Sequence, residues 1–167
     1  MTFLPQGPKR TRGGVYRRDV ARILRTQLPD GFFHVHTLGV ADTAVYRDDE
    51  DRRSWLQVFR SAVRRYRWEI HALCLMTTHY HVVLESKCEQ LSSGMQWLNG
   101  RYAQDFNRRY KRKGHLFGDR FRSWIIEDEE YLRAACRYAV YNPVRAGLCD
   151  HPWEWPWTAS QYDLRTL

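Results

Sequence analysis

The sequence lacks two kinds of hydrophobic segment. No run approaches the roughly 20 consecutive apolar residues that a membrane helix requires, and the start of the chain has no apolar core of a secretion signal. Residues 1–14 instead combine proline and glycine with basic side chains. These absences exclude a membrane-spanning or secreted protein, and we expect a protein of the cytoplasm that associates with the nucleoid.

The cysteines lack the spacing of a zinc knuckle or of a disulfide framework. Cys74, Cys88, Cys136 and Cys149 form no CxxC pair, and Cys74 and Cys136 lie in apolar runs. We therefore expect four reduced thiols, as in other cytoplasmic proteins. The sequence also contains no internal repeat, so its 167 residues predict one domain with additional segments at its ends.

Basic residues outnumber acidic residues. The chain has 27 Lys and Arg against 19 Asp and Glu, a net charge of +8 and an isoelectric point near 9.6. Clustered cations repel one another unless phosphates neutralise them, so this balance favours a polyanionic partner. Aromatic residues make up 14% of the chain and provide surfaces on which unpaired bases can stack. Charge alone would also fit a basic protein with no such partner, but the two features together favour nucleic acid.

The hydrophobic pattern predicts an α+β domain. Runs of β-forming residues predict strands, and apolar residues at three- and four-residue steps predict helices. The expected order is strand 32–38, helix 48–65, strands 68–76 and 79–85, helix 90–110, strand 120–126 and helix 131–141. Only Thr77 and Thr78 separate the two middle strands, which indicates an antiparallel hairpin. We expect a four-stranded antiparallel sheet with packed helices, an α+β sandwich of ferredoxin-like type.

Composition divides the chain into three segments. Residues 1–31 predict a basic arm and a short helix at 16–28, and such an arm is ordered only when an acidic partner holds it. Residues 32–148 contain the predicted domain. Residues 149–167 form a tail with tryptophan and proline, which we expect to pack on the domain.

Two histidines separated by one residue lie within the predicted strand 79–85. Side chains at positions i and i+2 of a strand point to the same side of the sheet, so His79 and His81 can present two imidazoles to one metal ion. His34 and His36 have the same spacing. Most such pairs are surface or packed histidines, so spacing alone does not decide which pair has a function.

The last predicted helix carries a tyrosine and an asparagine on one face. Tyr138 and Asn142 are four residues apart, so a nucleophilic phenol can lie beside an amide oxygen that is able to bind a metal. Both residues also have structural interpretations. Asn142 precedes Pro143 and can be the N-cap of a following helix, and Tyr138 can be a core aromatic residue.

Six segments in order along the chain form a recognisable set. They are residues 75–85 (LMTTHYHVVLE), 100–110 (GRYAQDFNRRY), 114–117 (GHLF), 120–123 (RFRS), 138–148 (YAVYNPVRAGL) and 153–160 (WEWPWTAS). Together they are similar to REP-associated tyrosine transposases, which are single-tyrosine transposases with an HUH motif (U being a bulky apolar residue). Several motifs at matching separations are more specific than any one. The sequence departs from the pattern at Thr77 and Thr78, where Pro-Asn is common, and at the polar-tipped Tyr80 in position U.

This resemblance implies a fold, an activity and a site. The fold is the ferredoxin-like, RRM-like HUH endonuclease fold, and the activity is cleavage and rejoining of hairpin-forming, REP-like palindromic single-stranded DNA through a covalent 5′-phosphotyrosine. By the resemblance, His79 and His81 bind a divalent metal, Tyr138 is the nucleophile and Asn142 completes the metal site. Mixed imidazole and oxygen ligands suit magnesium or manganese. The pair at 34 and 36 falls outside the motif, where we expect packing or DNA-facing residues.

Basic side chains near the second half of the domain are candidates for phosphate contact. They are Arg101, Arg108, Arg109, Lys111, Arg112, Lys113, Arg120 and Arg122. A solvated charged surface is the ordinary explanation for such a run. The sequence is consistent with a monomer or a homodimer.

Two other functions are compatible with the same sequence. A domesticated relative can bind hairpin DNA or RNA without catalysis, using sheet aromatics as RRM domains do. A related HUH nickase can initiate replication or plasmid transfer, but those proteins usually have further domains or a second tyrosine.

Overall fold

The protein is described by a computed structural model, which places residues 30–166. The predicted arm and the helix at 16–28 lie outside the described residues. Within residues 30–166, no helix is long and apolar enough to cross a membrane. The main elements are β1 (Gly31–Leu38), α1 (Asp49–Tyr66), β2 (Glu69–Leu75), β3 (His79–Ser86), α2 (Cys88–Arg109), β4 (Arg122–Ile126), α3 (Glu129–Val140), α4 (Asn142–Arg145) and β5 (Thr158–Ser160).

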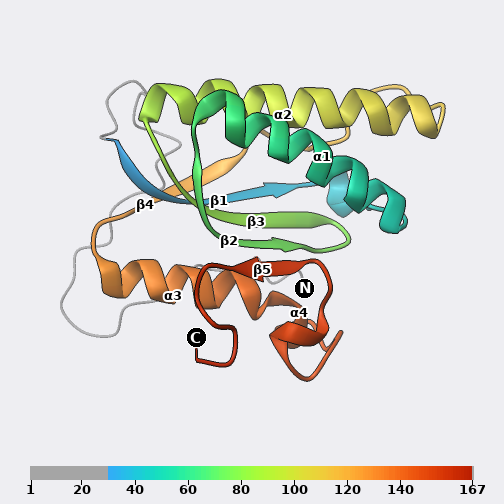
Figure 1. Ribbon diagram of the computed structural model, residues 1–167. Coiled ribbons are helices and arrows are strands. Elements are labelled where there is room, and N and C mark those ends of the chain that lie inside the picture. Colours follow the sequence, from blue (N-terminus) through green and yellow to red (C-terminus); the bar gives the residue numbers. More distant parts are fainter. Residues whose placement is uncertain (1–29, 167) are drawn as a thin grey trace.

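The sheet has the strand order β4-β1-β3-β2-β5, and each neighbouring pair is antiparallel. The first four strands and the first two helices follow the order βαββαβ, so the expected α+β fold of ferredoxin-like type is confirmed. Residues 76–78, which include Thr77 and Thr78, form the tight connection of the antiparallel hairpin between β2 and β3. β1 lies between β4 and β3, which places two histidine-bearing strands side by side (Figure 1).

The predicted number of strands was wrong, because the sheet has five strands and not four. The fifth strand, β5, is three residues long and comes from the C-terminal segment. It pairs with β2, with Leu73 opposite Ala159. The Trp155 indole donates a hydrogen bond to the carbonyl of Leu75 at 2.9 Å, next to this edge. A strand this short has too few residues to show alternation in the sequence.

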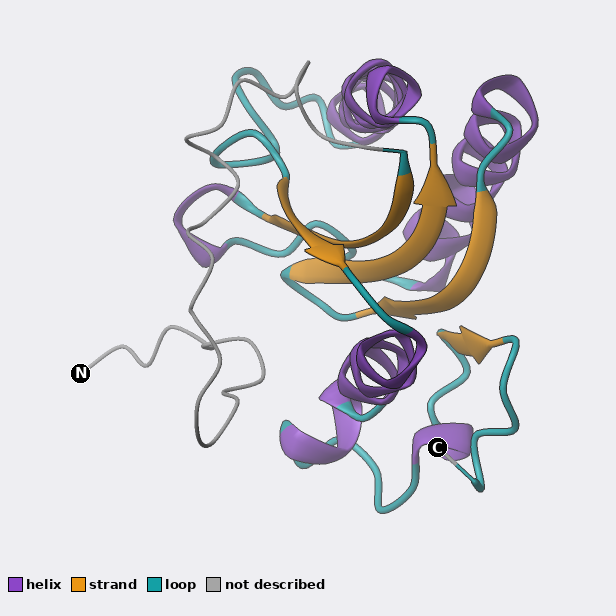
Figure 2. Ribbon diagram, turned by 90° about the vertical axis from the view of Figure 1, so that its left-hand side faces the viewer, coloured by secondary structure: helices purple, strands orange, loops and turns teal. Residues whose placement is uncertain are grey.

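Helices α1 and α2 cover one face of the sheet, and α3 covers the other (Figures 1 and 2). The larger core lies under α1 and α2 and includes Trp55, Tyr80 and Tyr102. Tyr80 is fully buried there, and its hydroxyl donates to Asn99 at 2.6 Å. Tyr80 therefore points to the face of the sheet opposite the neighbouring histidines.

The smaller core lies between the sheet and α3. Small side chains of α3, including Ala135, Cys136 and Ala139, pack against Ala72 and Val83 of the sheet. These small residues allow the helix backbone to approach the sheet closely, so the last turn of α3 comes near the histidine-bearing strands. Asp128 caps the start of α3 by accepting the backbone N–H of the third residue along, at 2.7 Å.

Candidate active site

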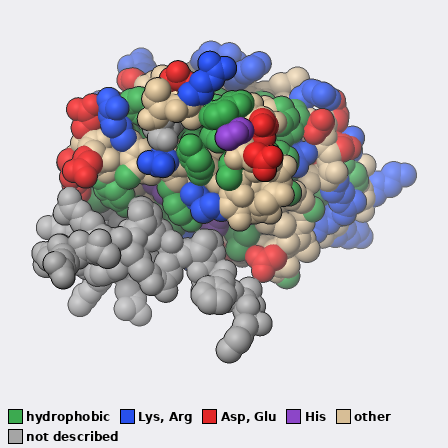
Figure 3. Space-filling view, turned by 90° about the horizontal axis from the view of Figure 1, so that it is seen from below, with side chains coloured by type: hydrophobic (Ala, Val, Ile, Leu, Met, Phe, Trp, Pro, Cys, Tyr) green, Lys and Arg blue, Asp and Glu red, His purple; other side chains and the backbone are tan. Residues whose placement is uncertain are grey.

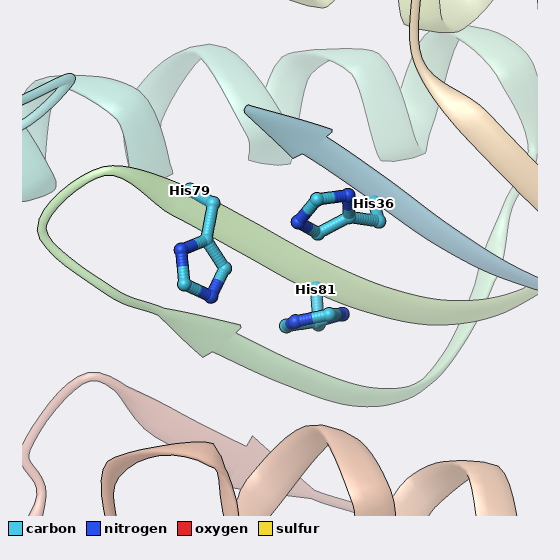
Figure 4. Close-up of side chains that lie close together, drawn as sticks. All are labelled: His36, His79 and His81. Carbon is cyan, nitrogen blue, oxygen red and sulfur yellow. The ribbon is translucent and has the colours of Figure 1, made fainter. Parts of the chain in front are cut away.

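Three histidines from two neighbouring strands meet on the face of the sheet that α3 covers. His36 of β1 lies directly opposite His81 of β3, and His79 is two residues before His81. Alternation along each strand sends all three side chains to the same face. One ring nitrogen from each lies within 4.8 Å of the other two. Figure 4 shows the three imidazoles gathered over β1 and β3. We call them the histidine cluster.

His36 is a residue that the sequence interpretation placed outside the metal site. The structure brings it together with the HUH pair because the antiparallel register between β1 and β3 sets His36 beside His81. The second HxH pair was the signal that could have identified it. That signal was insufficient, since the register between strands more than forty residues apart is not visible in local periodicity.

Burial keeps the imidazoles of the cluster neutral. Burial, followed by the nearby His79, His34 and Arg122, lowers the pKa of His36 to about 3. Burial also lowers the pKa of His79, and it lowers the pKa of His81 well below its ordinary value. An imidazole with a pKa below 6.5 is largely uncharged at pH 7, and neutral imidazole is the form that binds metals.

The hydrogen bonds of the cluster leave one imidazole nitrogen without a partner among residues 30–166. His81 is 3% exposed, and its Nε2 has no hydrogen-bond partner among residues 30–166. Its Nδ1 is 2.9 Å from Nε2 of His34, and Nδ1 of His79 is 3.1 Å from Oγ1 of Thr78. Other buried polar atoms among residues 30–166 also lack a partner, including both ring nitrogens of His71, but His71 is not in the histidine cluster. Three convergent imidazoles, one with a free nitrogen, fit a divalent metal ion.

Tyr138 faces this cluster from the last turn of α3. The centroid of its ring is 5.6 Å from that of His81 and 5.6 Å from that of His34. The side chain is partly exposed, so a substrate can reach it. The structure thus brings the phenol that the sequence singled out onto the same face as the HUH histidines.

Arg145 is a site residue that the sequence reasoning missed. Its guanidinium carbon lies 4.3 Å from the centroid of the Tyr138 ring, and an Nη2 hydrogen bond ties it to the carbonyl of Tyr138. A cation above an aromatic ring is attracted by the ring face. Arg145 follows Tyr138 by seven residues, about two helical turns, and this spacing could have indicated the contact.

Asn142 contacts the end of the helix that carries the tyrosine. Its Nδ2 donates to the carbonyls of Tyr138 at 2.9 Å and of Ala139 at 3.3 Å. The interpretation of Asn142 as an N-cap is wrong, because Tyr141 has the cap position of α4 and Asn142 is its first helical residue. Its role as a metal ligand stays a prediction.

The predicted phosphate-binding residues are divided between the two faces of the molecule. Arg122 of β4 lies directly opposite His36, beside the histidine cluster. Arg101, Arg108 and Arg109 lie on α2, which covers the other face of the sheet. Both Arg101 and Arg108 form ion pairs with Asp105, and their side chains remain 52% and 72% exposed. The remaining four residues belong to the segment of the chain that connects α2 to β4: Lys111, Arg112, Lys113 and Arg120.

Arg109 differs from its neighbours because two carboxylates hold it. Its guanidinium donates to both oxygens of Asp48, at 2.8 and 2.7 Å, and to Asp51. Asp51 is buried and also accepts the hydroxyl of Tyr110 at 2.8 Å. The network connects the end of α2 to the beginning of α1.

Substitution of Arg109 should therefore reduce stability more than DNA binding. In Arg109→Ala the buried Asp51 carboxylate loses its cation, and we expect the urea midpoint of unfolding to fall. Arg108→Ala is the matched control on the same turn. It should unfold like the wild type in urea but reduce the salt dependence of DNA binding by about one phosphate contact. The reverse pattern would assign Arg109 to the DNA surface.

Comparison with known proteins identifies the family. The family model for IS200-like transposases matches residues 33–142. This chain belongs to that family. The matched range of the IS200-like transposase begins in β1 and ends at Asn142, so it includes the histidine cluster and Tyr138. The family expected from the sequence motifs is confirmed.

Individual relatives agree with this assignment. The IS200-like transposase is 23% identical over 166 residues to a Haemophilus influenzae protein named for the REP-associated tyrosine transposases, a match that covers 90% of this chain and 87% of that protein. It also resembles the solved structure of a REP-associated tyrosine transposase bound to a REP hairpin. That structure has a TM-score of 0.66 and 15% identity, with 88% of this chain and 82% of the other covered.

The fold alone does not specify which reaction an enzyme catalyses. The tRNA(His) guanylyltransferase of Saccharomyces cerevisiae also resembles the IS200-like transposase, with a TM-score of 0.50 and 14% identity over 77% of this chain and 70% of the other. Enzymes with different reactions can share a ferredoxin-like sheet. The function must therefore be argued from the site residues.

Proposed function

We propose that this protein is a metal-dependent tyrosine transposase that cleaves and rejoins hairpin-forming, REP-like single-stranded DNA in the cytoplasm. The observation that carries the proposal is the meeting of the histidine cluster with Tyr138 on one face of the sheet. Membership of the IS200-like family supports a transposase. The relative named for REP-associated transposases and the neighbour solved with a REP hairpin support hairpin DNA as substrate.

The metal site would be formed by His36, His79 and His81, with Asn142 as a further oxygen ligand. Bound magnesium or manganese would polarise the scissile phosphate and neutralise charge that grows in the transition state. The protein holds these ligands on strands inside a sheet, so they need little rearrangement to bind. Nε2 of His81, which has no hydrogen-bond partner among residues 30–166, would provide the essential ligand atom.

Tyr138 would be the nucleophile. Its phenolic oxygen forms a bond to the scissile phosphorus, the bond from that phosphorus to the 3′ oxygen breaks, and the phenol proton is lost. The products are a 5′-phosphotyrosine and a strand with a free 3′-hydroxyl, which takes up a proton. The covalent bond conserves the energy of the phosphodiester, so rejoining needs no nucleotide cofactor. Arg145, held against the Tyr138 ring, supplies positive charge next to the adduct.

Basic side chains would bind the DNA around this centre. Figure 3 shows Lys and Arg side chains gathered at the edge of the molecule where α2 ends. Arg122 lies closest to the centre along the sheet, because it is the register partner of His36. We propose that Arg122 contacts the phosphates beside the cleaved bond and that the α2 residues hold a more distant part of the hairpin.

The proposal predicts a covalent complex with hairpin DNA. Wild-type protein, manganese and a hairpin copied from inverted repeats beside the encoding gene should give a protein–DNA adduct that survives denaturing electrophoresis. A label at the 3′ end of the DNA should move with the protein, and a label at the 5′ end should stay on a free fragment. A perfect duplex with the same bases is the control and should remain intact. Tight hairpin binding without cleavage would favour a non-catalytic binding protein.

A further inference from the structure

His34 lies between the histidine cluster and the tyrosine, and the proposed reaction gives it no role. Its Nε2 is 2.9 Å from Nδ1 of His81. Its ring packs against Trp124, with 5.5 Å between ring centroids, and against Tyr138 at 5.6 Å. Only 4% of His34 is exposed. Packing against Trp124 and Tyr138 therefore fixes the orientation of the His34 ring, with its Nε2 directed at Nδ1 of His81.

The hydrogen bond between the two rings has one polarity that suits a metal ligand. A neutral imidazole carries one N–H, and its other nitrogen has a free lone pair. When Nδ1 of His81 donates to Nε2 of His34, the lone pair of His81 Nε2 is available to a metal. The opposite polarity puts the proton on His81 Nε2, which has no acceptor within residues 30–166. An unpaired buried donor costs free energy, so the first polarity is favoured.

We infer that His34 is a positioning residue, which holds His81 in the Nδ1–H tautomer and thereby leaves Nε2 as the metal-binding atom. The inference rests on the metal site of the proposed function. Metal-binding histidines usually bond their second nitrogen to a carboxylate, a backbone carbonyl or water. Here a second imidazole has that position. β1 thus supplies two residues to the site. His36 is a ligand, and His34, two positions earlier in β1, orients the ligand His81 of β3.

The tautomer can be measured without metal or DNA. In metal-free wild type, ¹⁵N-resolved NMR of the imidazole rings at pH 7.5 should show the His81 proton on Nδ1. His34→Leu keeps an apolar side chain in the space but removes the acceptor, so the His81 proton should redistribute toward Nε2. His34→Gln offers a carbonyl acceptor and should restore the Nδ1–H form. A wild-type His81 with its proton on Nε2 would overturn the inference.

Metal affinity gives the second measurement. Loss of a second hydrogen-bond partner typically weakens metal binding by about 10–100-fold, and we expect this loss of Mn²⁺ affinity in His34→Leu by calorimetry. His34→Gln should recover most of the affinity. His71→Leu is the matched control, because His71 is also buried in the sheet but contacts Phe32. It should bind Mn²⁺ like the wild type.

The two measurements separate this inference from the proposed function. If the folded His34→Leu variant binds Mn²⁺ as tightly as the wild type, the role of His34 is wrong and the metal site stands. If the wild type binds no Mn²⁺, the proposed metal site fails, and the tautomer measurement still decides whether His34 orients His81. Circular dichroism checks that each variant is folded.

Discussion

Tyr138→Phe is expected to lose DNA cleavage and the covalent adduct, with a rate at least about 10³-fold below that of the wild type. The substitution removes one oxygen atom and keeps the ring against His81, His34 and Arg145. Hairpin affinity and stability should therefore change little. The measurement is a single-turnover cleavage assay with labelled hairpin DNA, and electrophoresis detects the adduct.

Tyr141→Phe is the control for this prediction. Tyr141 lies three residues further along, is also partly exposed, and contacts the guanidinium of Arg137 instead of the histidine cluster. Its variant should cleave DNA at the wild-type rate. An adduct that persists in Tyr138→Phe would mean that another group attacks the phosphate, and mass spectrometry of the labelled peptide would locate it.

Removal of His36 should be nearly as damaging as removal of either HUH histidine. The nitrogen of His36 lies within 4.8 Å of those of His79 and His81, so three imidazoles are placed to bind one ion. We expect His36→Ala to lower Mn²⁺ affinity by at least about tenfold and to reduce cleavage in proportion. Calorimetry measures the affinity, and excess EDTA should abolish cleavage by the wild type.

A second pair of variants decides which residue completes the metal site. His115→Ala is the surface control, since His115 is exposed and lies outside the histidine cluster, and it should bind Mn²⁺ normally. Asn142→Ala tests the ligand that the family resemblance implied. If Asn142→Ala weakens Mn²⁺ binding and His36→Ala does not, the oxygen ligand completes the site and His36 only packs beside it.

Local sequence patterns were sufficient for most of the fold. The run of β-forming residues at 32–38 and the amphipathic helix with Trp55 and Phe59 form the elements that those patterns predicted. The same reasoning missed β5, since three residues give no measurable period. That strand forms because the edge of β2 offers unpaired backbone groups, and the pairing partner lies more than eighty residues away.

The sequence by itself determined that His79 and His81 share one face, because alternation within a strand is a local property. Its motifs also indicated Tyr138. Only the tertiary structure decided what surrounds them: strand register placed His36 opposite His81, and the packing of α3 placed Tyr138 against His34. Register and helix packing depend on contacts between distant segments, and no spacing along the chain contains that information.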